Sequence, residues 1–525
     1  MADTTPNPPD APVDPPVRRL SAEEQDHEDR RQGTRGAATN FLTLAGQAAL
    51  LIFQVLGARM FGAAVWGAYA FGVSLLEIGA RLGLVGTDKG ILIFVAARRS
   101  TGDLAGADRA LATGIRLAVA LGCVIATGFA LAAGAVGRSY HNPNFGLALL
   151  ILAPAVPMVT LTTVLLAATM ARKNLRYNLL VKGVTEPVLR VGLVVVAGLA
   201  ASGITGLSFV HLLAATGTLS VAVWSFSRLF PLRKMAWAAL RLPFDGGMVS
   251  YAVPLAVSEL VNGFLAQTSI LLLGKYRPAE EVGIYGASLV LAAAVSFVRG
   301  AFDTVLAPIA AEAWVNHDHP RLASNLRSQS CMVLLFAIPL SSLFIVGGKV
   351  LLGLHGAAFV AGTTTLLLLA TGHVVNASCG LAGWVLMAGG RSRTMLVNNL
   401  LALAANVGLC LVLIPRFGME GAALAALCAL VVLQAVQSFE AHLLARAHPF
   451  SRAFLRLAAL GVVIMVAEWL LVNHLPGPPI AIAAGVIFVG ALAFWGLAWA
   501  VSTPEHRDML RGLLLRRFRG GTAAT

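Results

Sequence analysis

The chain has 525 residues, of which 57% are hydrophobic and 12% charged, and its formal net charge is +14. Soluble domains carry about 25% charged residues, so this composition excludes an ordinary soluble enzyme. Apolar runs of about 20 residues, long enough to cross a bilayer as helices, recur from Phe41 onward. The expected fold class is an all-α polytopic membrane protein, whose positive charge reflects cytoplasmic loops rather than a nucleic-acid surface.

The first segment, residues 1–34, is polar and rich in proline, with too few apolar side chains to fold alone. We therefore expect a disordered cytoplasmic tail. No short apolar segment followed by a small-residue cleavage site opens the chain, so no signal peptide is expected.

About fourteen transmembrane helices follow, in groups of six, six and two. Their expected ranges are 38–60, 64–86, 113–136, 146–170, 178–201, 206–228, 249–273, 283–307, 328–347, 362–387, 394–414, 419–440, 453–473 and 479–501. The expected division is an N-terminal six-helix lobe (35–228), a cytoplasmic linker (229–248), a C-terminal six-helix lobe (249–440), an accessory helix pair (441–502) and a basic cytoplasmic tail (503–525). That tail can lie on anionic membrane lipids.

The distribution of Lys and Arg predicts the orientation. With the N-terminus inside, six of the 39 Lys and Arg residues fall in outward loops and four within spans, which leaves 29 on the cytoplasmic side. This excess follows the positive-inside rule. Both termini are therefore expected in the cytoplasm.

The two six-helix lobes are expected to be copies of one unit, because the stretch 57–84 has a weaker copy that begins at Gly274. Setting Gly67–Tyr69 (GAY) on Gly283–Tyr285 (GIY) requires an offset of 216 residues. Within one residue of that offset, Gly203 falls on Gly418. Since each copy has an even number of spans, the copies run parallel and are related by a pseudo-twofold axis along the membrane normal.

Ionisable and amide side chains concentrate in the first two spans of each copy. Such groups are costly inside a bilayer and usually face a protein interior or a watery cavity. The sets that share a helical face are Asn40, Gln47 and Gln54; Ser74, Glu77, Arg81 and Asp88; Glu259, Asn262 and Ser269; and Ser296, Arg299 and Asp303. These sets predict a central cleft between the lobes. In the alternative, each Arg neutralises a carboxylate four residues away on its own helix, and the amides only join helices.

In a cleft, these residues would have different roles. Arg81 and Arg299 are candidates for holding a pyrophosphate, since a guanidinium stays charged and offers paired donors to phosphate oxygens. The candidates for binding sugar hydroxyls are Asn40, Gln47, Gln54 and Asn262. The candidates for binding a coupling ion, or for balancing charge, are Glu77, Glu259 and Asp303.

Other polar residues are expected to be structural. Lys182, Glu186 and Arg190 are spaced as a ladder along the fifth span, and Glu468 is expected to form an interhelical hydrogen bond. His317 and His319 lack further ligands nearby, so no metal site is expected.

Sequence motifs for catalysis are missing. No nucleotide-binding, metalloprotease, esterase or dinucleotide-binding motif occurs. The expected outward loops have about a dozen residues at most, too few for an external catalytic domain. We therefore expect no enzymatic activity and no cofactor.

The chain resembles the oligosaccharide flippases of the polysaccharide-transporter kind, in the multidrug/oligosaccharidyl-lipid/polysaccharide (MOP) exporter superfamily. The resemblance covers about residues 35–503, and its carriers are Gly57–Gly62 (GARMFG), Gly67–Tyr69, Pro254, Leu271–Gly274 (LLLG) and Gly283–Tyr285. It implies a V-shaped, two-lobed bundle that works by alternating access. It also implies a cavity with cationic residues on the first, second, seventh and eighth spans, two of which carry Arg81 and Arg299.

The function that the resemblance implies is transfer of undecaprenyl-pyrophosphate-linked oligosaccharide from the inner to the outer leaflet of a bacterial cytoplasmic membrane. The expected partners are this lipid-linked oligosaccharide, anionic lipids and polysaccharide polymerase or export machinery, with no nucleic acid. Three alternatives remain: a cation-coupled multidrug antiporter, a membrane glycan polymerase and a non-transporting scaffold.

Overall fold

The computed structural model describes residues 22–475 and 478–501, with side chains from Gly46 onward except at residues 301, 304, 305, 308, 500 and 501. Within these ranges every regular element is a helix, as the sequence predicts. The first lobe contains α1 (Ala22–Leu84), α2 (Thr87–Ser100), α3 (Leu104–Ser139), α4 (Pro143–Leu152), α5 (Ala155–Ala171), α6 (Arg176–Asn178), the π-helix η1 (Leu179–Thr185), α7 (Glu186–Leu199) and α8 (Gly203–Ser227).

The linker contains a further helix, α9 (Leu232–Arg241). The second lobe consists of α10 (Gly246–Tyr276), α11 (Ala279–Ala293), α12 (Ser296–Val315), α13 (His319–Ile345), α14 (Gly348–His355), the short 3₁₀ helix η2 (Ala357–Gly362), α15 (Thr363–Cys379), α16 (Ala382–Ala388) and α17 (Ser392–Ala445). The accessory pair is α18 (Arg452–His474) and α19 (Pro479–Val501).

Two of the long helices each contain one sharp corner. α1 turns at Gly62 (φ 78°, ψ 167°) and α17 turns at Gly418 (φ 55°, ψ −133°). Glycine adopts these conformations readily because it has no Cβ atom. Both corners lie where the sequence predicts a connection between consecutive spans.

The number of spans is only partly defined by the helices. Within the described residues, ten segments are long and apolar enough to cross a membrane, or eleven if the bent pair α4 and α5 counts as one span. Two of these segments, Gly46–Ser100 and Ser392–Ala445, contain the glycine corners. The total of fourteen helices therefore stays a prediction.

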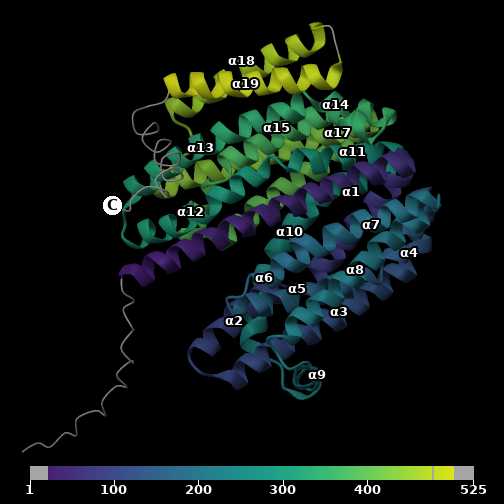
Figure 1. Ribbon diagram of the computed structural model, residues 1–525, viewed down its shortest axis with the longest axis vertical. Helices are drawn as coiled ribbons and strands as arrows, with labels where there is room; N and C mark the ends of the chain where they lie inside the picture. Colours follow the sequence, from purple (N-terminus) through teal and green to yellow (C-terminus); the bar gives the residue numbers. More distant parts are fainter. Residues whose placement is uncertain (1–21, 476–477, 502–525) are drawn as a thin grey trace, which may run out of the picture.

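The helices form two lobes, with α1 running diagonally between them in Figure 1. The accessory pair α18 and α19 lies on the outer edge of the second lobe, against α13 (Figure 1). Ser342 of α13 donates a hydrogen bond to Glu468 of α18, which is the interhelical contact expected for this buried carboxyl group.

The lobes meet where the second half of α1 crosses α11, and the contact is reciprocal. A Cβ atom at Gly67 would clash with the carbonyl oxygen of Ala279 and lie 2.7 Å from the nitrogen of Gly283. A Cβ atom at Gly283 would clash with the carbonyl oxygen of Ala63 and lie 2.9 Å from the nitrogen of Gly67. These residues are related by the repeat offset, so this exchange of equivalent contacts is what a pseudo-twofold axis between two copies produces.

A second feature supports the repeat. Gly203, at the start of α8, and Gly418, in the corner of α17, both have a positive φ, of 59° and 55°. The sequence aligns these two glycines to within one residue. The similar φ values and the reciprocal glycine contact are both what the expected duplication predicts.

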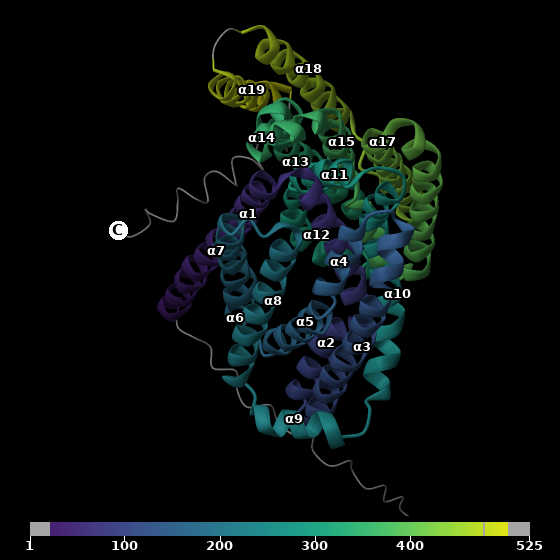
Figure 2. The same cartoon turned by 90° about the vertical axis from the view of Figure 1, so that its right-hand side faces the viewer.

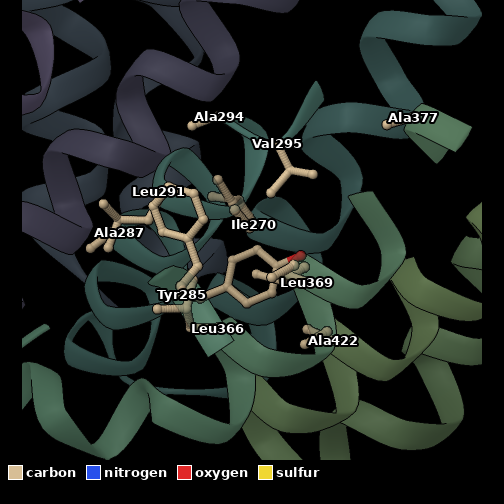
Figure 3. Packing of buried hydrophobic residues seen from close by; sticks show 14 of the residues in the cluster. Ile270, Tyr285, Ala287, Leu291, Ala294, Val295, Leu366, Leu369, Ala377 and Ala422 are labelled. Carbon is tan, nitrogen blue, oxygen red and sulfur yellow. The ribbon is translucent and has the colours of Figure 1, made fainter. Parts of the chain in front are cut away.

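The largest buried core extends from that contact into the second lobe. Figure 3 shows Tyr285 and Leu291 of α11 beside Ile270 of α10, with Leu366 and Leu369 of α15 packed against them. These side chains are at most 5% exposed. Close packing of this kind resists deformation, so it fixes the positions of the helices that surround the site.

Several local expectations differ from the structure. α1 begins at Ala22, so residues 22–34 are helical rather than structureless, which fits their content of the helix-forming residues Glu, Gln and Arg. Residues 1–21 and the expected basic tail at 503–525 lie outside the described residues. The linker is partly helical, because α9 occupies its middle.

Three of the expected spans are broken: the fourth (146–170) at residues 153–154, the eighth (283–307) at 294–295 and the tenth (362–387) at 380–381. The second expected span (64–86) ends at a sharp turn. α1 ends at Leu84, and the left-handed Gly86 (φ 70°) redirects the chain into α2. Asp88 therefore does not continue the helical face of Glu77 and Arg81, contrary to the prediction from spacing. The eighth span divides into α11 and α12 at residues 294–295, so Arg299 and Asp303 belong to a separate helix from the core contacts of α11.

Candidate functional site

Three adjoining cavities lie around α10 and α11, with volumes of about 270, 390 and 250 Å³. The first and second share Asn262, and the second and third share Gln267, Leu289 and Val290. They therefore form a row from α12 and α17 of the second lobe to α1 and α7 of the first. Below they are called the amide cavity, the apolar cavity and the aromatic cavity, in that order.

Five of the eleven residues that line the amide cavity are carboxamides of the second lobe. These carboxamides are Asn262, Asn376, Asn399, Gln434 and Gln437, and Arg299 and Trp384 line the same cavity. Arg299 lies 3.4 Å from Asp303 and donates to the side-chain oxygen of Asn376 over 3.4 Å. Trp384 donates to the same Asp303 oxygen that accepts from Arg299, over 2.6 Å. This arrangement matches the alternative in which Arg299 neutralises a carboxylate of its own helix.

The apolar cavity lies between the other two and is lined largely by aliphatic and aromatic side chains, among them Tyr285 and Phe297. Its polar groups are few. His373 and Ser296 share a hydrogen bond of 2.9 Å, and Ser269 lies 3.3 Å from the amide nitrogen of Asn406. A passage of this composition separates two more polar sites.

The aromatic cavity is formed where α1 faces α10 and α11. Its rings are those of Phe53, Trp66 and Tyr69, with centroids 5.8 Å apart for the first two and 5.2 Å for the last two. Tyr69 is hydrogen-bonded to His211 over 2.9 Å. Gln54 donates to the carbonyl oxygen of Ala287 over 2.9 Å, which joins the lobes.

Charged side chains also reach the aromatic cavity. Glu77 accepts a hydrogen bond of 2.6 Å from Gln267 of α10. Arg190 lines the same cavity, where its guanidinium lies 5.9 Å from the ring of Phe53. Its partner is Glu186, 2.6 Å away, which also binds Lys182 over 3.0 Å. The ladder expected along the fifth span is thus present, and one end of it faces the cavity.

Arg81 does not pair with Glu77, the carboxylate four residues earlier on its own helix. Its guanidinium lies 3.4 Å from Glu259 of α10, across the face of Gly263. Both side chains are about 40% exposed, at 39% and 43%. Exposed ion pairs contribute little stability, so this contact between α1 and α10 can open at low cost.

The predicted site residues fall into three groups. Asn262, Arg299 and Asp303 lie together at the amide cavity, and Gln54 and Glu77 lie at the aromatic cavity. The remaining candidates are separate from both groups: Arg81 pairs with Glu259, Gln47 lines none of the three cavities, and the side chain of Asn40 lies outside the described residues.

Several cavity residues were missed in the sequence. Asn399 and Gln434 lie on the two halves of α17. Trp384 lies on α16, which contains no charged residue to indicate a site. A signal was present, because Gln434 and Gln437 are three residues apart on an apolar helix, as amides on one face would be. Among the described residues, no cluster of three or more His, Cys, Asp or Glu side chains that could hold a metal ion occurs.

The linker end of α10 is tied to the first lobe. Asp245 caps α10 by accepting a hydrogen bond of 3.1 Å from the Met248 amide. Its carboxylate is also ion-paired with Arg98 of α2, which donates to both carboxylate oxygens, from Nη2 to Oδ1 over 3.2 Å. Figure 2 shows α9 crossing this end of the molecule and leading into α10. Burial opposes ionisation of Asp245, but the hydrogen bonds from Arg98 and Met248 outweigh it and hold its pKa below the usual value.

Replacing Asp245 with Asn is expected to destabilise the protein at pH 7 by about 1.5–3 kcal/mol, the range for hydrogen bonds to charged groups. A carboxyl group with a lowered pKa stabilises the fold above its unfolded pKa of about 3.9 and loses that effect as the pH falls through its folded pKa. The difference in melting temperature between wild type and Asp245→Asn should therefore hold from pH 7 to about pH 4 and shrink only below that pH. A difference independent of pH would contradict this account.

Comparison with known proteins supports the resemblance. The sequence model of a family described as "Polysaccharide biosynthesis protein" matches residues 45–356. No curated protein sequence matches the chain. Among solved structures, "Lipid II flippase MurJ, inward closed conformation" aligns with a TM-score of 0.63 and 13% identity, covering 90% of this chain and 100% of that one.

Multidrug transporters of the MATE family also align. An inward-facing member, described as belonging to the MOP superfamily, gives a TM-score of 0.61 at 13% identity and covers 76% of this chain and 94% of that one. An outward-facing member, described in the same way, gives a TM-score of 0.55 at 14% identity and covers 77% of this chain and 94% of that one. At these identities the structures show the shared fold. The chain, matched by the family model over more than half its length, belongs to the polysaccharide biosynthesis protein family and has the fold of the MOP exporters.

Proposed function

We propose that this membrane protein is a flippase that moves undecaprenyl-pyrophosphate-linked oligosaccharide from the inner to the outer leaflet for surface polysaccharide biosynthesis. The observation that carries the proposal is the row of three cavities around α10 and α11, which joins an amide-rich site to an apolar passage. A cargo with a sugar head and a lipid tail needs both environments. Family membership and the flippase fold support the same function.

Alternating access would use the contacts between the lobes. The glycines Gly67 and Gly283 let α1 and α11 approach so closely that the lobes can pivot there. The ion pair of Arg81 with Glu259 and that of Arg98 with Asp245 hold α10 against the first lobe. Release of these pairs would free α10 and change which end of the cavity row is open.

The residue roles belong to this proposal. Arg81 is half-exposed and weakly paired, which makes it the better candidate for contacting a pyrophosphate. Glu77 and Glu259 are placed to bind a coupling ion or to balance Arg81, while Asp303 balances Arg299. The proposed location is the cytoplasmic membrane, with both termini inside, and the proposed partners are anionic lipids and the polymerase or export machinery of the same pathway.

The test is the lipid-linked glycan pool of a strain that lacks the protein, extracted and separated by leaflet. Accumulation of pyrophosphate-linked oligosaccharide on the cytoplasmic face, with loss of surface polymer, is the expected result. Unpolymerised units already in the outer leaflet would instead identify a polymerase.

A cation-coupled multidrug antiporter is the second candidate. The aromatic cavity favours it, because three rings and the carboxylate of Glu77 surround a space suited to a flat cation. A normal glycan pool together with increased sensitivity to cationic dyes in the deletion strain would support the antiporter over the flippase.

A further inference from the structure

The amide cavity contains hydrogen-bonding groups that the protein itself does not use. The side chains of Asn262, Asn399 and Gln437 have no hydrogen-bond partner within the described part of the chain, and the side-chain oxygen of Gln434 is buried without one. Asn399, Gln434 and Gln437 are 5%, 3% and 6% exposed. The side-chain nitrogen of Gln434 donates to Asn376 over 2.8 Å, which leaves its buried oxygen as the costly unpaired atom. A ligand that donates to this oxygen and bonds the free carboxamides would be stabilised here.

The ligand must both donate and accept hydrogen bonds. Each carboxamide has two donor sites and an acceptor oxygen, and these converge on the cavity from α10, α15 and the two halves of α17. A hydroxyl group also donates and accepts, so a ligand with several hydroxyls complements such a set. A phosphate, which only accepts, would leave the amide oxygens unpaired.

The cavity is electrically neutral. Its only ionisable wall residue among those described is Arg299, which Asp303 neutralises on the same helix. The Asp303 oxygen also accepts from Trp384, so the pair is fixed by the wall itself. A charged ligand would therefore find no free counter-charge here, in contrast to the half-exposed Arg81.

The rest of the wall is suited to a sugar ring. Trp384, Met387, Met395 and Leu433 offer apolar surface for the C–H face of a pyranose. The volume of about 270 Å³ lies just below the range of about 300–1,000 Å³ that is usual for small-molecule sites. This is room for a single sugar residue rather than for a whole oligosaccharide.

We propose that the amide cavity is a glycan subsite that binds one neutral, polyhydroxylated sugar residue of the lipid-linked cargo, separately from its pyrophosphate. This inference rests on the proposed flippase function and adds to it where the sugar is recognised. The cavity then acts as the part of the protein that selects the glycan. A site built to bind hydroxyls discriminates strongly against ligands that lack them.

The experiment compares two probes: bare undecaprenyl pyrophosphate, and the lipid-linked glycan extracted from a strain that lacks the protein. Affinities are measured on the purified full chain in lipid nanodiscs. Wild type is expected to bind the glycan-bearing lipid at least tenfold more tightly. Asn399→Leu and Gln437→Leu should each reduce that preference about five- to tenfold, the effect of one lost hydrogen bond, while bare undecaprenyl pyrophosphate binds unchanged and so reports correct folding.

Two further variants sharpen the test. Gln437→Glu keeps the size of the side chain but adds a charge and should also weaken the preference. Asn473→Leu, on the exposed face of α18, removes a carboxamide far from the cavity and should change nothing.

The outcomes separate the two proposals. An unchanged glycan preference in Asn399→Leu and Gln437→Leu, or an extracted glycan composed only of acidic sugars, would overturn the subsite and leave the flippase standing. Failure of wild type to bind either lipid would overturn both.

Discussion

Replacing Arg299 with Ala is expected to reduce export of the lipid-linked cargo at least tenfold, while the protein still inserts into the membrane. The change removes the partner of Asp303 and the donor to Asn376, and it leaves an uncompensated carboxylate beside the amide cavity. An uncompensated charge of this kind is destabilising where burial is appreciable. Export is measured as the fraction of lipid-linked glycan that reaches the outer leaflet.

The matched control is Arg321→Ala. Arg321 is also ion-paired with a carboxylate, Glu312 at 2.9 Å, but both side chains are largely exposed and lie away from the cavities. This control should export normally. Wild-type export by Arg299→Ala would remove Arg299 from the site.

Adding a methyl group at the contact between the lobes is expected to have the second large effect. In Gly67→Ala or Gly283→Ala, the new Cβ atom would collide with a backbone carbonyl oxygen of the opposite helix, which no side-chain rotation can relieve. Overpacking of this kind costs about 1–3 kcal/mol. The lobes should separate at this point, and both variants should show the same shift in inter-lobe distance by spin labelling and the same loss of export.

Gly192→Ala and Gly408→Ala are the controls, because these glycines are also related by the repeat offset but have no atom within 4 Å of the added Cβ. They should be neutral or slightly stabilising, since alanine favours helix. Strongly unequal effects of Gly67→Ala and Gly283→Ala would contradict a pivot on the pseudo-twofold axis.

The fold was largely predictable because a membrane limits the secondary structures that a spanning segment can adopt. Apolar runs of sufficient length must be helices, and the repeat could be found from glycines at a constant offset. The break at residues 294–295 could not be found, since the apolar composition continues across it and the backbone changes direction without a change in hydropathy. The turn at Gly86, by contrast, coincides with the predicted end of the second span.

The site was predicted less completely. Charges such as Arg81 and Arg299 stand out in an apolar helix, but their partners depend on which helices become neighbours. Arg81 pairs with Glu259 of another helix rather than with Glu77, because α10 packs against α1. The amides of α17 carry no charge and so do not stand out in the sequence, although they supply three of the five carboxamides of the amide cavity.

The most direct test of the central claim is transfer across a bilayer by the purified protein. Liposomes are prepared with the extracted lipid-linked glycan in both leaflets, and an impermeant glycosidase removes whatever is exposed outside. With the wild-type protein the inner-leaflet pool should become accessible and be consumed, whereas liposomes without protein, or with Arg299→Ala, should keep it protected. Protection of the inner pool by liposomes that contain correctly folded wild-type protein would contradict the flippase.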